Sequence, residues 1–335
     1  MLNTKPKKII VTTVPFSDTD KTPTQLLEQE SIKYSINPLN RKLKPNEVAD
    51  IISDHSIVIA GTEPITAEVM DACPNLKAIC RVGIGLDSVD LIEAKKRGIT
   101  VSYTPDGPST AVAELSLGLI LDALRNISSA NQKMRNGIWH RYHGSRIAKS
   151  TIGIIGMGRI GALLTNHLCR GFPDVKILAN DIIDKSDQFT YDNIEWVGKD
   201  TIYKESDVIS LHIPLTATTR DLIGADELNM MKPSSALVNT ARGSIVNEKA
   251  LAEALKNNEI RMAAVDVFEE EPYNGELLEL DNIILTCHMG SMTKDCRARM
   301  EIEATEEAIR FMKGEDFMNP VPESEYELAA QMALT

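Results

Sequence analysis

Close pairs of cysteines are missing from this sequence. The chain has an odd number of cysteines and no Cys-x-x-Cys pair; the five are Cys73, Cys80, Cys169, Cys287 and Cys296. Such usage is typical of reduced thiols in a cytoplasm rather than of a disulfide framework. We also predict no metal site.

Long apolar runs are missing as well. No stretch approaches the length of a transmembrane helix. The basic residues 1–8 are not followed by an apolar core of signal-peptide length, because Pro15, Asp18 and Asp20 interrupt it. We therefore expect a cytoplasmic protein without a membrane partner.

The chain has fewer basic than acidic residues. The 335 residues include 36 Lys and Arg against 48 Asp and Glu, which gives a net charge of −12. Such an acidic chain is a poor candidate for binding nucleic acid or anionic membranes, and an anionic substrate would need a local cationic pocket. The length indicates about two globular domains.

Strand and helix patterns alternate along the chain in two series. The first series has predicted strands at residues 8–14, 32–36, 57–60, 76–82 and 99–103. The second has them at 151–155, 175–179, 208–212, 236–239, 263–267 and 283–286. Strands separated by helices predict an α/β fold with two doubly wound parallel sheets.

The two series are joined by breaker residues at 104–108 and a helical pattern over 109–135. The early part of that pattern is apolar nearly all round, so we expect a buried helix that joins two domains. A long helix at 294–313 and a partly irregular tail follow the last strand and should return to the first sheet. We predict a discontinuous substrate domain, 1–105 plus 293–335, and a dinucleotide-binding domain over 106–292.

A dinucleotide-binding pattern follows the first strand of the second series. Gly156, Gly158 and Gly161 form a G-x-G-x-x-G turn between a strand and an amphipathic helix. Gly156 permits the tight turn, Gly158 lets the backbone approach a pyrophosphate, and Gly161 allows close helix packing. The free N–H groups at the helix N-terminus would then face the phosphates.

An acidic residue after the next strand indicates which cofactor is bound. Asp181 lies about 20 residues after Gly161, where its carboxylate can accept hydrogen bonds from both ribose hydroxyls. The same carboxylate would repel a 2′-phosphate, so the pattern favours NAD over NADP. An isolated glycine motif would also fit an ordinary strand-to-helix turn, but the flanking strand, helix and acid favour the dinucleotide site.

Three further polar residues follow predicted strands, where ligands bind in open α/β sheets. They are Arg242, Glu271 and His288. Hydride transfer to the C2 of a 2-keto acid also moves a proton to the C2 oxygen, and histidine exchanges protons near neutral pH. A carboxylate fixes the tautomer of such a histidine, and arginine binds the substrate carboxylate. Taken singly, each residue would also fit a structural or solvated role.

Further motifs extend this pattern over nearly the whole chain. They are RVGIGLDSVD (81–90), PLTATTRDLI (214–223), NTARGSIVNEKAL (239–251), DVFEEEP (266–272) and CHMGSMT (287–293). With the glycine turn, they make the chain resemble the D-isomer-specific 2-hydroxyacid dehydrogenases, above all the short forms of D-3-phosphoglycerate dehydrogenase. The resemblance implies a Rossmann NAD-binding domain inserted in a flavodoxin-like substrate domain, and a homodimer.

The resemblance also implies roles for individual residues. Arg242 would bind the substrate carboxylate, Glu271 would pair with the histidine, and His288 would exchange the proton. The cofactor would contact Gly156, Gly158, Arg159, Ile160, Gly161, Asp181, Ile213, Thr240, Ala241, Asp266, His288, Gly290 and Ser291. The substrate would contact Arg81, Val82, Gly83, Ile84, Gly85, Arg141 and Arg242.

The sequence departs from the family pattern at three positions. Ser88 stands where asparagine is usual, Cys287 replaces the usual proline before the histidine, and Ala60 replaces a phosphate-binding arginine of some phosphoglycerate enzymes. Arg81 and Arg141 still match basic positions that contact substrate phosphate in that subgroup. The basic cluster at 139–146 is open to three interpretations: a solvated loop, a dimer contact, or a segment that reaches a neighbour's active site.

We therefore predict an NAD-dependent oxidoreductase that transfers a hydride between NAD and a D-2-hydroxy acid. The favoured substrate is 3-phosphoglycerate, which would place the enzyme in serine biosynthesis. The alternatives are a reductase of glyoxylate, hydroxypyruvate or a sugar-derived acid and, from another class, an NAD-sensing corepressor-like binding protein. A formate dehydrogenase is disfavoured because that branch lacks the glutamate–histidine pair.

Overall fold

The chain folds into two compact units in a computed structural model that describes residues 8–332. One unit is Met1–Pro108 with Met292–Thr335, and the other is Ser109–Ser291. The bounds inferred from the sequence differ from these by up to three residues. Residues 1–7, which include most of the basic N-terminal stretch, and residues 333–335 lie outside the described part of the chain.

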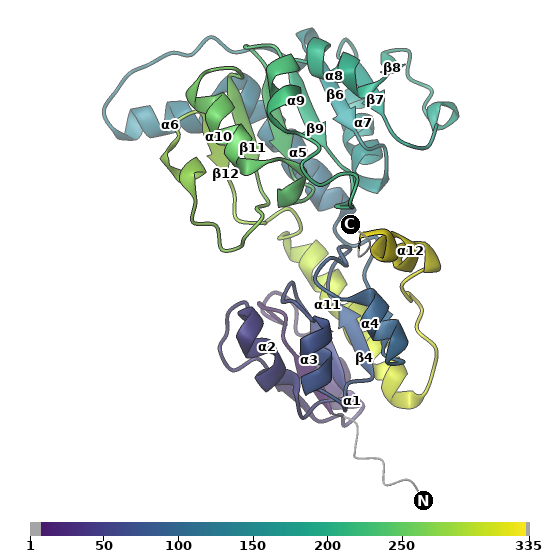
Figure 1. Cartoon of the computed structure of the whole chain (residues 1–335). Helices are drawn as coiled ribbons and strands as arrows, with labels where there is room; N and C mark the ends of the chain where they lie inside the picture. Colours follow the sequence, from purple (N-terminus) through teal and green to yellow (C-terminus); the bar gives the residue numbers. More distant parts are fainter. Residues whose placement is uncertain (1–7, 333–335) are drawn as a thin grey trace, which may run out of the picture. The chain divides into compact units, whose positions relative to one another are not determined.

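The first unit is built on a parallel sheet of five strands in the order β2-β1-β3-β4-β5 (Figure 1). The strands are β1 (Ile9–Val11), β2 (Tyr34–Ile36), β3 (Ile57–Ala60), β4 (Ala78–Arg81) and β5 (Thr100–Ser102). This order is that of flavodoxin-like doubly wound sheets. The central strands β1, β3 and β4 are fully buried, as expected for a parallel sheet covered on both faces.

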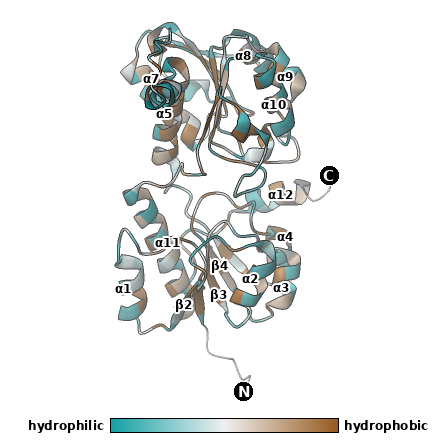
Figure 2. Ribbon diagram, turned by 90° about the vertical axis from the view of Figure 1, so that its left-hand side faces the viewer, coloured by the Kyte–Doolittle hydropathy of each residue, from teal (hydrophilic) through white to brown (hydrophobic). Residues whose placement is uncertain are grey.

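Helices cover both faces of this sheet, with α1 and α11 on one side and α2, α3 and α4 on the other (Figure 2). The helices are α1 (Thr22–Gln29), α2 (Pro45–Ile52), α3 (Ala67–Ala72), α4 (Leu91–Lys96), α11 (Lys294–Lys313) and α12 (Glu323–Met332). The tail returns to this unit, because Pro320 bridges Ser102 and α12 contacts α4. The sequence had suggested a partly irregular tail, whereas α12 makes its last part helical.

The second unit is built on a parallel sheet of seven strands in the order β12-β11-β10-β9-β6-β7-β8. The strands are β6 (Thr151–Ile155), β7 (Lys176–Asn180), β8 (Ile194–Trp196), β9 (Val208–Leu211), β10 (Ala236–Asn239), β11 (Met262–Val265) and β12 (Ile283–Leu285). The order reverses direction at β6, so the crevice beyond β6 and β9 is the expected ligand site of such a sheet. The prediction of two doubly wound parallel sheets is confirmed.

Helices also cover both faces of the second sheet (Figure 2). They are α5 (Ser109–Arg125), α6 (Ile127–Arg135), α7 (Arg159–Gly171), α8 (Lys199–Glu205), α9 (Ala225–Met230) and α10 (Glu248–Lys256). Helix α5 packs on α7 and on β10 and β11, as its apolar sequence predicted. The single helix expected over 109–135 is wrong, because Asn126 adopts a left-handed conformation with φ of 55° and separates α5 from α6.

The glycine turn after β6 depends on close backbone contacts. Gly156 has φ of +98°, and a Cβ atom there would overlap the carbonyl group of His212, which directly follows β9. A Cβ atom at Gly161 would overlap the carbonyl oxygen of Gly156. The first turn of α7 can therefore pack directly on the end of β6 only because Gly161 has no side chain.

We predict that Gly161→Ala destabilises the second unit by at least about 2 kcal/mol, because backbone must move to admit the methyl group. Gly171→Ala is the matched control in the same helix, since a Cβ atom there meets nothing within 4 Å. Urea unfolding followed by circular dichroism measures both variants. Equal stability of the two variants would contradict the packing described here.

Candidate active site

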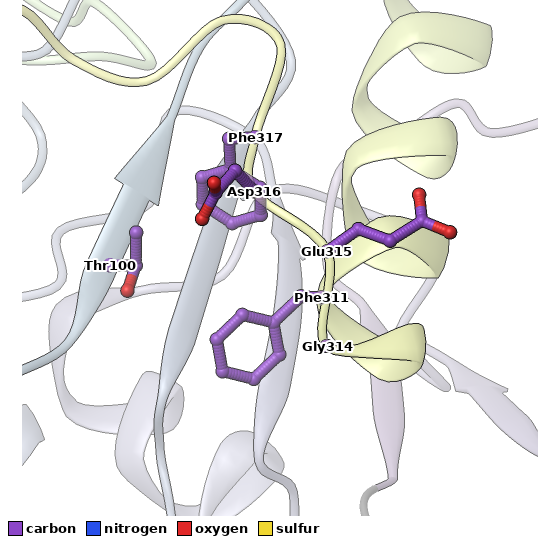
Figure 3. A pocket seen from close by; sticks show the side chains of 6 residues that line it. All are labelled: Thr100, Phe311, Gly314, Glu315, Asp316 and Phe317. Carbon is purple, nitrogen blue, oxygen red and sulfur yellow. The ribbon is translucent and has the colours of Figure 1, made fainter.

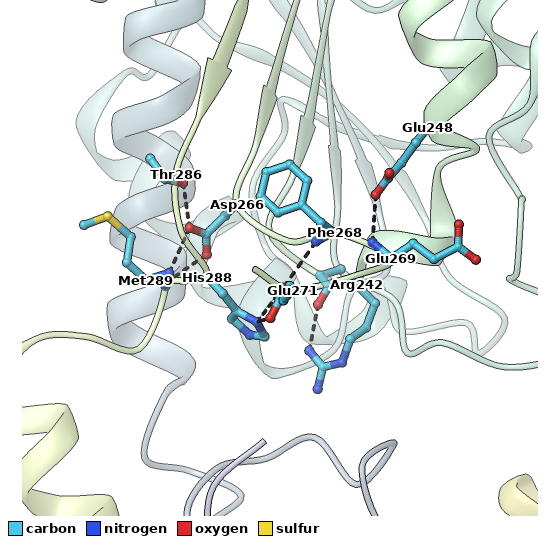
Figure 4. A network of polar contacts seen from close by, with 11 residues as sticks. Arg242, Glu248, Asp266, Phe268, Glu269, Glu271, Thr286, His288 and Met289 are labelled. Carbon is cyan, nitrogen blue, oxygen red and sulfur yellow. Dashed lines mark hydrogen bonds and ion pairs between the residues drawn. The ribbon is translucent and has the colours of Figure 1, made fainter. Parts of the chain in front are cut away.

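Three of the predicted residues follow neighbouring strands of the second sheet. Arg242 follows β10, Glu271 follows β11 and His288 follows β12. Because the sheet is parallel and its order is β12-β11-β10, these residues lie beyond the same edge, where ligands bind in open α/β sheets. Figure 4 shows the side chains of His288 and Glu271 turned toward each other, with Arg242 beside them.

His288 and Glu271 form a close pair. Nδ1 of His288 lies 2.9 Å from each of the two carboxylate oxygens of Glu271. An ionised carboxylate can only accept hydrogen bonds, so Nδ1 carries a proton and Nε2 is the nitrogen that can exchange a proton with a ligand. The backbone N–H of Phe268 donates to the same carboxylate at 3.2 Å, which orients Glu271. The His288 side chain is 36% exposed and that of Glu271 19%, so a ligand can reach the pair.

Asp266 fixes the loop that carries His288. Its buried carboxylate accepts hydrogen bonds from Thr286 Oγ1 at 2.6 Å, from Met289 N at 2.9 Å and from Gly290 N at 3.0 Å. Its carbonyl oxygen accepts from His288 N at 2.7 Å. His288 has φ of 50°, a conformation that non-glycine residues adopt only when their surroundings hold them there. The structure therefore gives Asp266 a positioning contact that the sequence had not indicated.

The loop that carries Arg242 is fixed in the same way. Asn239 accepts from Ala241 N at 3.0 Å and donates to Arg242 O at 2.8 Å, and Arg242 Nη1 donates to Ala241 O at 2.7 Å. A Cβ atom at Gly243 would overlap the backbone of Phe268, so this loop lies directly against the loop that carries Glu271. Gly243 thus permits the close approach of two catalytic candidates.

The residues expected on the nicotinamide side surround the same strand ends. Thr240 Oγ1 lies 2.8 Å from Ser116 Oγ of α5, and Ala241 is buried next to it. A Cβ atom at Gly290 would contact both Val112 of α5 and the Asp266 carboxylate. Ser291 follows at the end of the unit. The sequence offered no sign of Ser116, because an isolated serine in an apolar helix has no motif around it.

The glycine turn has room where a pyrophosphate would lie. A Cβ atom at Gly158 meets nothing within 4 Å, in contrast to Gly156 and Gly161. Gly158 is the N-cap of the 13-residue helix α7, and Arg159 and Ile160 form its first turn. Ile213 lies against Gly156. The open space and the N–H groups of the helix terminus fit the phosphates of a dinucleotide.

Asp181 lies beside this turn, at the end of β7. Its carboxylate accepts hydrogen bonds from Met157 N at 2.7 Å and from Ile183 N at 3.0 Å. Lys185 Nζ lies 3.3 Å from Asp181 Oδ2 and donates to Met157 O at 3.0 Å. Burial raises the pKa of Asp181, but the two backbone hydrogen bonds and the Lys185 charge outweigh burial and lower the pKa overall. An ionised carboxylate thus lies where a ribose hydroxyl could donate to it. Lys185 did not stand out in the sequence.

One of the predicted phosphate-binding arginines is engaged within the first unit. Arg81 is buried, donates a short hydrogen bond to Val82 O and lies against Gly83, which has φ of 139°. Gly83 N donates to Thr104 Oγ1 at 2.8 Å, which holds the start of the loop that continues through Ile84 and Gly85. Arg141 is exposed and belongs to the second unit.

A separate pocket lies in the first unit at the end of α11 (Figure 3). Two phenylalanine rings and two acidic residues contribute to it; the lining residues are Thr100, Phe311, Gly314, Glu315, Asp316 and Phe317. None of these six residues is cationic, so the pocket is unsuited to an acid substrate. The candidate site therefore rests on the strand ends of the second unit.

Several curated relatives of this chain are reductases or dehydrogenases of small acids. A glyoxylate reductase of Thermofilum pendens is 43% identical over 263 residues, which cover 76% of this chain and 77% of the relative. A hydroxypyruvate reductase of Thermotoga maritima is 37% identical over 299 residues, with 87% and 95% covered. A D-3-phosphoglycerate dehydrogenase of Methanocaldococcus jannaschii is 36% identical over 284 residues, with 82% and 53% covered.

Solved structures of related dehydrogenases have the same fold as this chain. The solved structure of a D-lactate dehydrogenase from Aquifex aeolicus, in complex with NAD and lactic acid, matches with a TM-score of 0.80 at 26% identity and covers 93% of this chain and 98% of its own. Among the described residues, no helix is both long and apolar enough to span a membrane. The NAD-binding domain of the D-isomer specific 2-hydroxyacid dehydrogenases matches residues 117–290. The chain therefore belongs to this family of NAD-dependent dehydrogenases.

Proposed function

We propose that the chain interconverts a small 2-keto acid and its D-2-hydroxy acid, with Arg242, Glu271 and His288 as catalytic residues. NAD, when bound in its reduced form, supplies the hydride that the keto carbon receives. The contact of His288 Nδ1 with both oxygens of Glu271 carries the proposal, because it leaves Nε2 to protonate the C2 oxygen. In the opposite direction Nε2 accepts the hydroxyl proton.

Glu271 and Arg242 have distinct tasks in this proposal. Glu271 stabilises the charged imidazole that forms when a hydroxyl proton is taken up, and it fixes the direction of the ring. Arg242 binds the substrate carboxylate through its planar guanidinium group, which matches a carboxylate in geometry. The loops ordered by Asn239 and Asp266 hold both side chains before substrate arrives, which reduces the entropy lost on binding.

We further propose that the cofactor follows the edge of the second sheet from Asp181 to His288. Asp181 would bind the adenosine ribose, and the N-terminus of α7 at Gly158, Arg159 and Ile160 would bind the pyrophosphate. Ile213, Thr240, Ala241, Asp266, Gly290 and Ser291 would surround the nicotinamide side. The first unit would supply the backbone amides of Val82, Gly83, Ile84 and Gly85 to the substrate carboxylate.

Among possible substrates we give first place to unphosphorylated acids such as glyoxylate and hydroxypyruvate. The glyoxylate reductase relative is more similar than the phosphoglycerate dehydrogenase, and the latter aligns over only 53% of its own length. Ala60 offers no charge, and the buried Arg81 guanidinium already donates to Val82 O. 3-Phosphoglycerate is the second candidate, favoured by the sequence motifs and by the basic residue Arg141.

The second unit also has an exposed apolar surface that a second copy of the chain would cover. Helix α6 has no buried residue, and Ile127, Met134, Ile138 and Trp139 are exposed, Trp139 to 79%. The segment 127–149 contains five basic residues and no acidic one, whereas the whole chain has a net charge of −12. We propose that this basic segment contacts the acidic surface of a second copy in a homodimer.

We predict that His288→Ala lowers kcat by at least about 1000-fold, because both the proton donor and its partner contact are lost. Glu271→Gln should lower kcat by about 10- to 100-fold, since its amide can still contact the ring but carries no charge. NADH binding, measured by fluorescence titration, should change less than about threefold in both variants. Turnover of His288→Ala near the wild-type rate would contradict the proposed role.

We predict a kcat/KM for glyoxylate or hydroxypyruvate at least about tenfold above that for 3-phosphohydroxypyruvate, because Ala60 offers no charge and the buried Arg81 guanidinium already donates to Val82 O. Steady-state oxidation of NADH with each acid measures this ratio. A preference for the phosphorylated acid would reverse the order of the two candidates. Loss of that preference in Arg141→Gln would then identify the phosphate contact.

We predict a dimer for the wild-type chain and a monomer for a variant with Ile138→Glu and Trp139→Glu, because buried carboxylates would oppose association. Light scattering after size exclusion at micromolar concentration measures the mass. Met318→Glu is the control, since Met318 is 68% exposed but lies in the first unit. A monomeric wild-type chain would refute the homodimer.

A further inference from the structure

The loop after β7 contains an ion pair that the proposed reaction does not use. Asp181 and Lys185 are in contact at 3.3 Å, and their side chains are only 11% and 21% exposed. The same lysine donates to Met157 O, while Asp181 accepts from Met157 N. Met157 is the residue between the first two glycines of the turn. Both polar backbone groups of Met157 are therefore held by this one ion pair.

Polar contacts, rather than apolar packing, hold the loop 181–185 in place. Ile182 and Ile183 are 100% and 60% exposed, so the loop is not held by apolar burial of these two side chains. Asp184 accepts from Ser186 N at 2.9 Å and contributes to the next turn. Lys185 and Asp181 both connect the loop to the glycine turn, Lys185 through Met157 O and Asp181 through Met157 N. Neutralising the carboxylate of Asp181 requires only the ion pair, so the hydrogen bond from Lys185 to Met157 O is an additional contact.

We infer that Lys185 determines cofactor specificity at the adenosine end of the site and also positions the glycine turn. This inference rests on the proposed placement of the cofactor beside Asp181. The Asp181 carboxylate repels a 2′-phosphate and so disfavours NADP. Lys185 places an ammonium group next to that carboxylate, and its positive charge weakens the repulsion. When the carboxylate is absent, the ammonium group is the cation that binds a 2′-phosphate.

The charges explain why the two residues act in opposite directions. A ribose hydroxyl donates to a carboxylate, and a 2′-phosphate is repelled by it. An ammonium group pairs with phosphate as a point charge. Because both side chains are largely shielded from water, their effects on a neighbouring phosphate are less screened than those of exposed groups. The lysine therefore limits the NAD preference of the wild-type chain and supplies latent affinity for NADP.

A double-mutant cycle on the full chain tests the inference through binding rather than turnover. Dissociation constants for NADH and NADPH are measured by fluorescence titration at fixed ionic strength. Asp181→Asn should tighten NADPH binding at least about tenfold, and Lys185→Gln in that background should remove most of the gain, as expected for one charge-assisted contact. Lys185→Gln alone should weaken NADH binding about threefold through a looser turn, and NADPH binding by more.

Two control variants accompany the cycle. Asp184→Asn removes an acid of the same loop whose carboxylate accepts from Ser186 N, and it should change the NADPH dissociation constant by less than about twofold. Lys176→Gln removes a lysine at the opposite end of β7 that pairs with Glu195 at 3.1 Å. It should leave the affinity for both cofactors unchanged. Thermal unfolding shows whether each variant is folded.

The outcomes separate this inference from the proposed function. If Asp181→Asn changes neither affinity, the proposed place of the ribose is wrong and the inference fails with it. If Asp181→Asn gains NADPH affinity and the double variant keeps the gain, the placement holds and the role of Lys185 is refuted. If Lys185→Gln weakens NADH and NADPH binding equally, both alone and together with Asp181→Asn, Lys185 only holds the glycine turn and its role in cofactor specificity is refuted.

Discussion

The parallel alignment of β10, β11 and β12 is the constraint on which the candidate active site depends. Residues that follow parallel strands meet at one sheet edge, even when they lie dozens of positions apart in the sequence. Arg242, Glu271 and His288 meet in this way. The same rule places the glycine turn after β6 and Asp181 after β7 along that edge. One sheet thus carries the residues of both the proposed cofactor site and the proposed catalytic site.

Hydrogen bonds to buried polar groups convert this topology into a fixed geometry. The carboxylate of Asp266 accepts three hydrogen bonds from the loop of His288, and Asn239 makes two in the loop of Arg242. Gly243 allows the latter loop to lie on the backbone of Phe268. Such preorganised groups need little rearrangement when charge develops on a substrate oxygen, which is where electrostatic catalysis gains most. The contacts of Asp266 and Asn239 are therefore part of the proposed site.

Much of this arrangement could be predicted from the sequence. The apolar strands and the glycine spacing follow local rules, which explains why both sheets and the turn at Gly156 were expected. The contacts of Asp266 and Lys185 could not be predicted, because they depend on how loops fold back on one another. The break at Asn126 was missed for a similar reason, since its left-handed backbone interrupts a continuous helical pattern. Nor could the sequence give the distance between His288 and Glu271.

The most direct test of the central claim is a crystal structure of the chain with NADH and oxamate, an unreactive analogue of a 2-keto acid. We expect the oxamate carboxylate to bind the guanidinium group of Arg242, and the adjacent carbonyl oxygen to lie within hydrogen-bond distance of His288 Nε2. The nicotinamide ring would lie beside the same carbon. Oxamate bound away from these two side chains, or Nε2 of His288 turned away from it, would contradict the account.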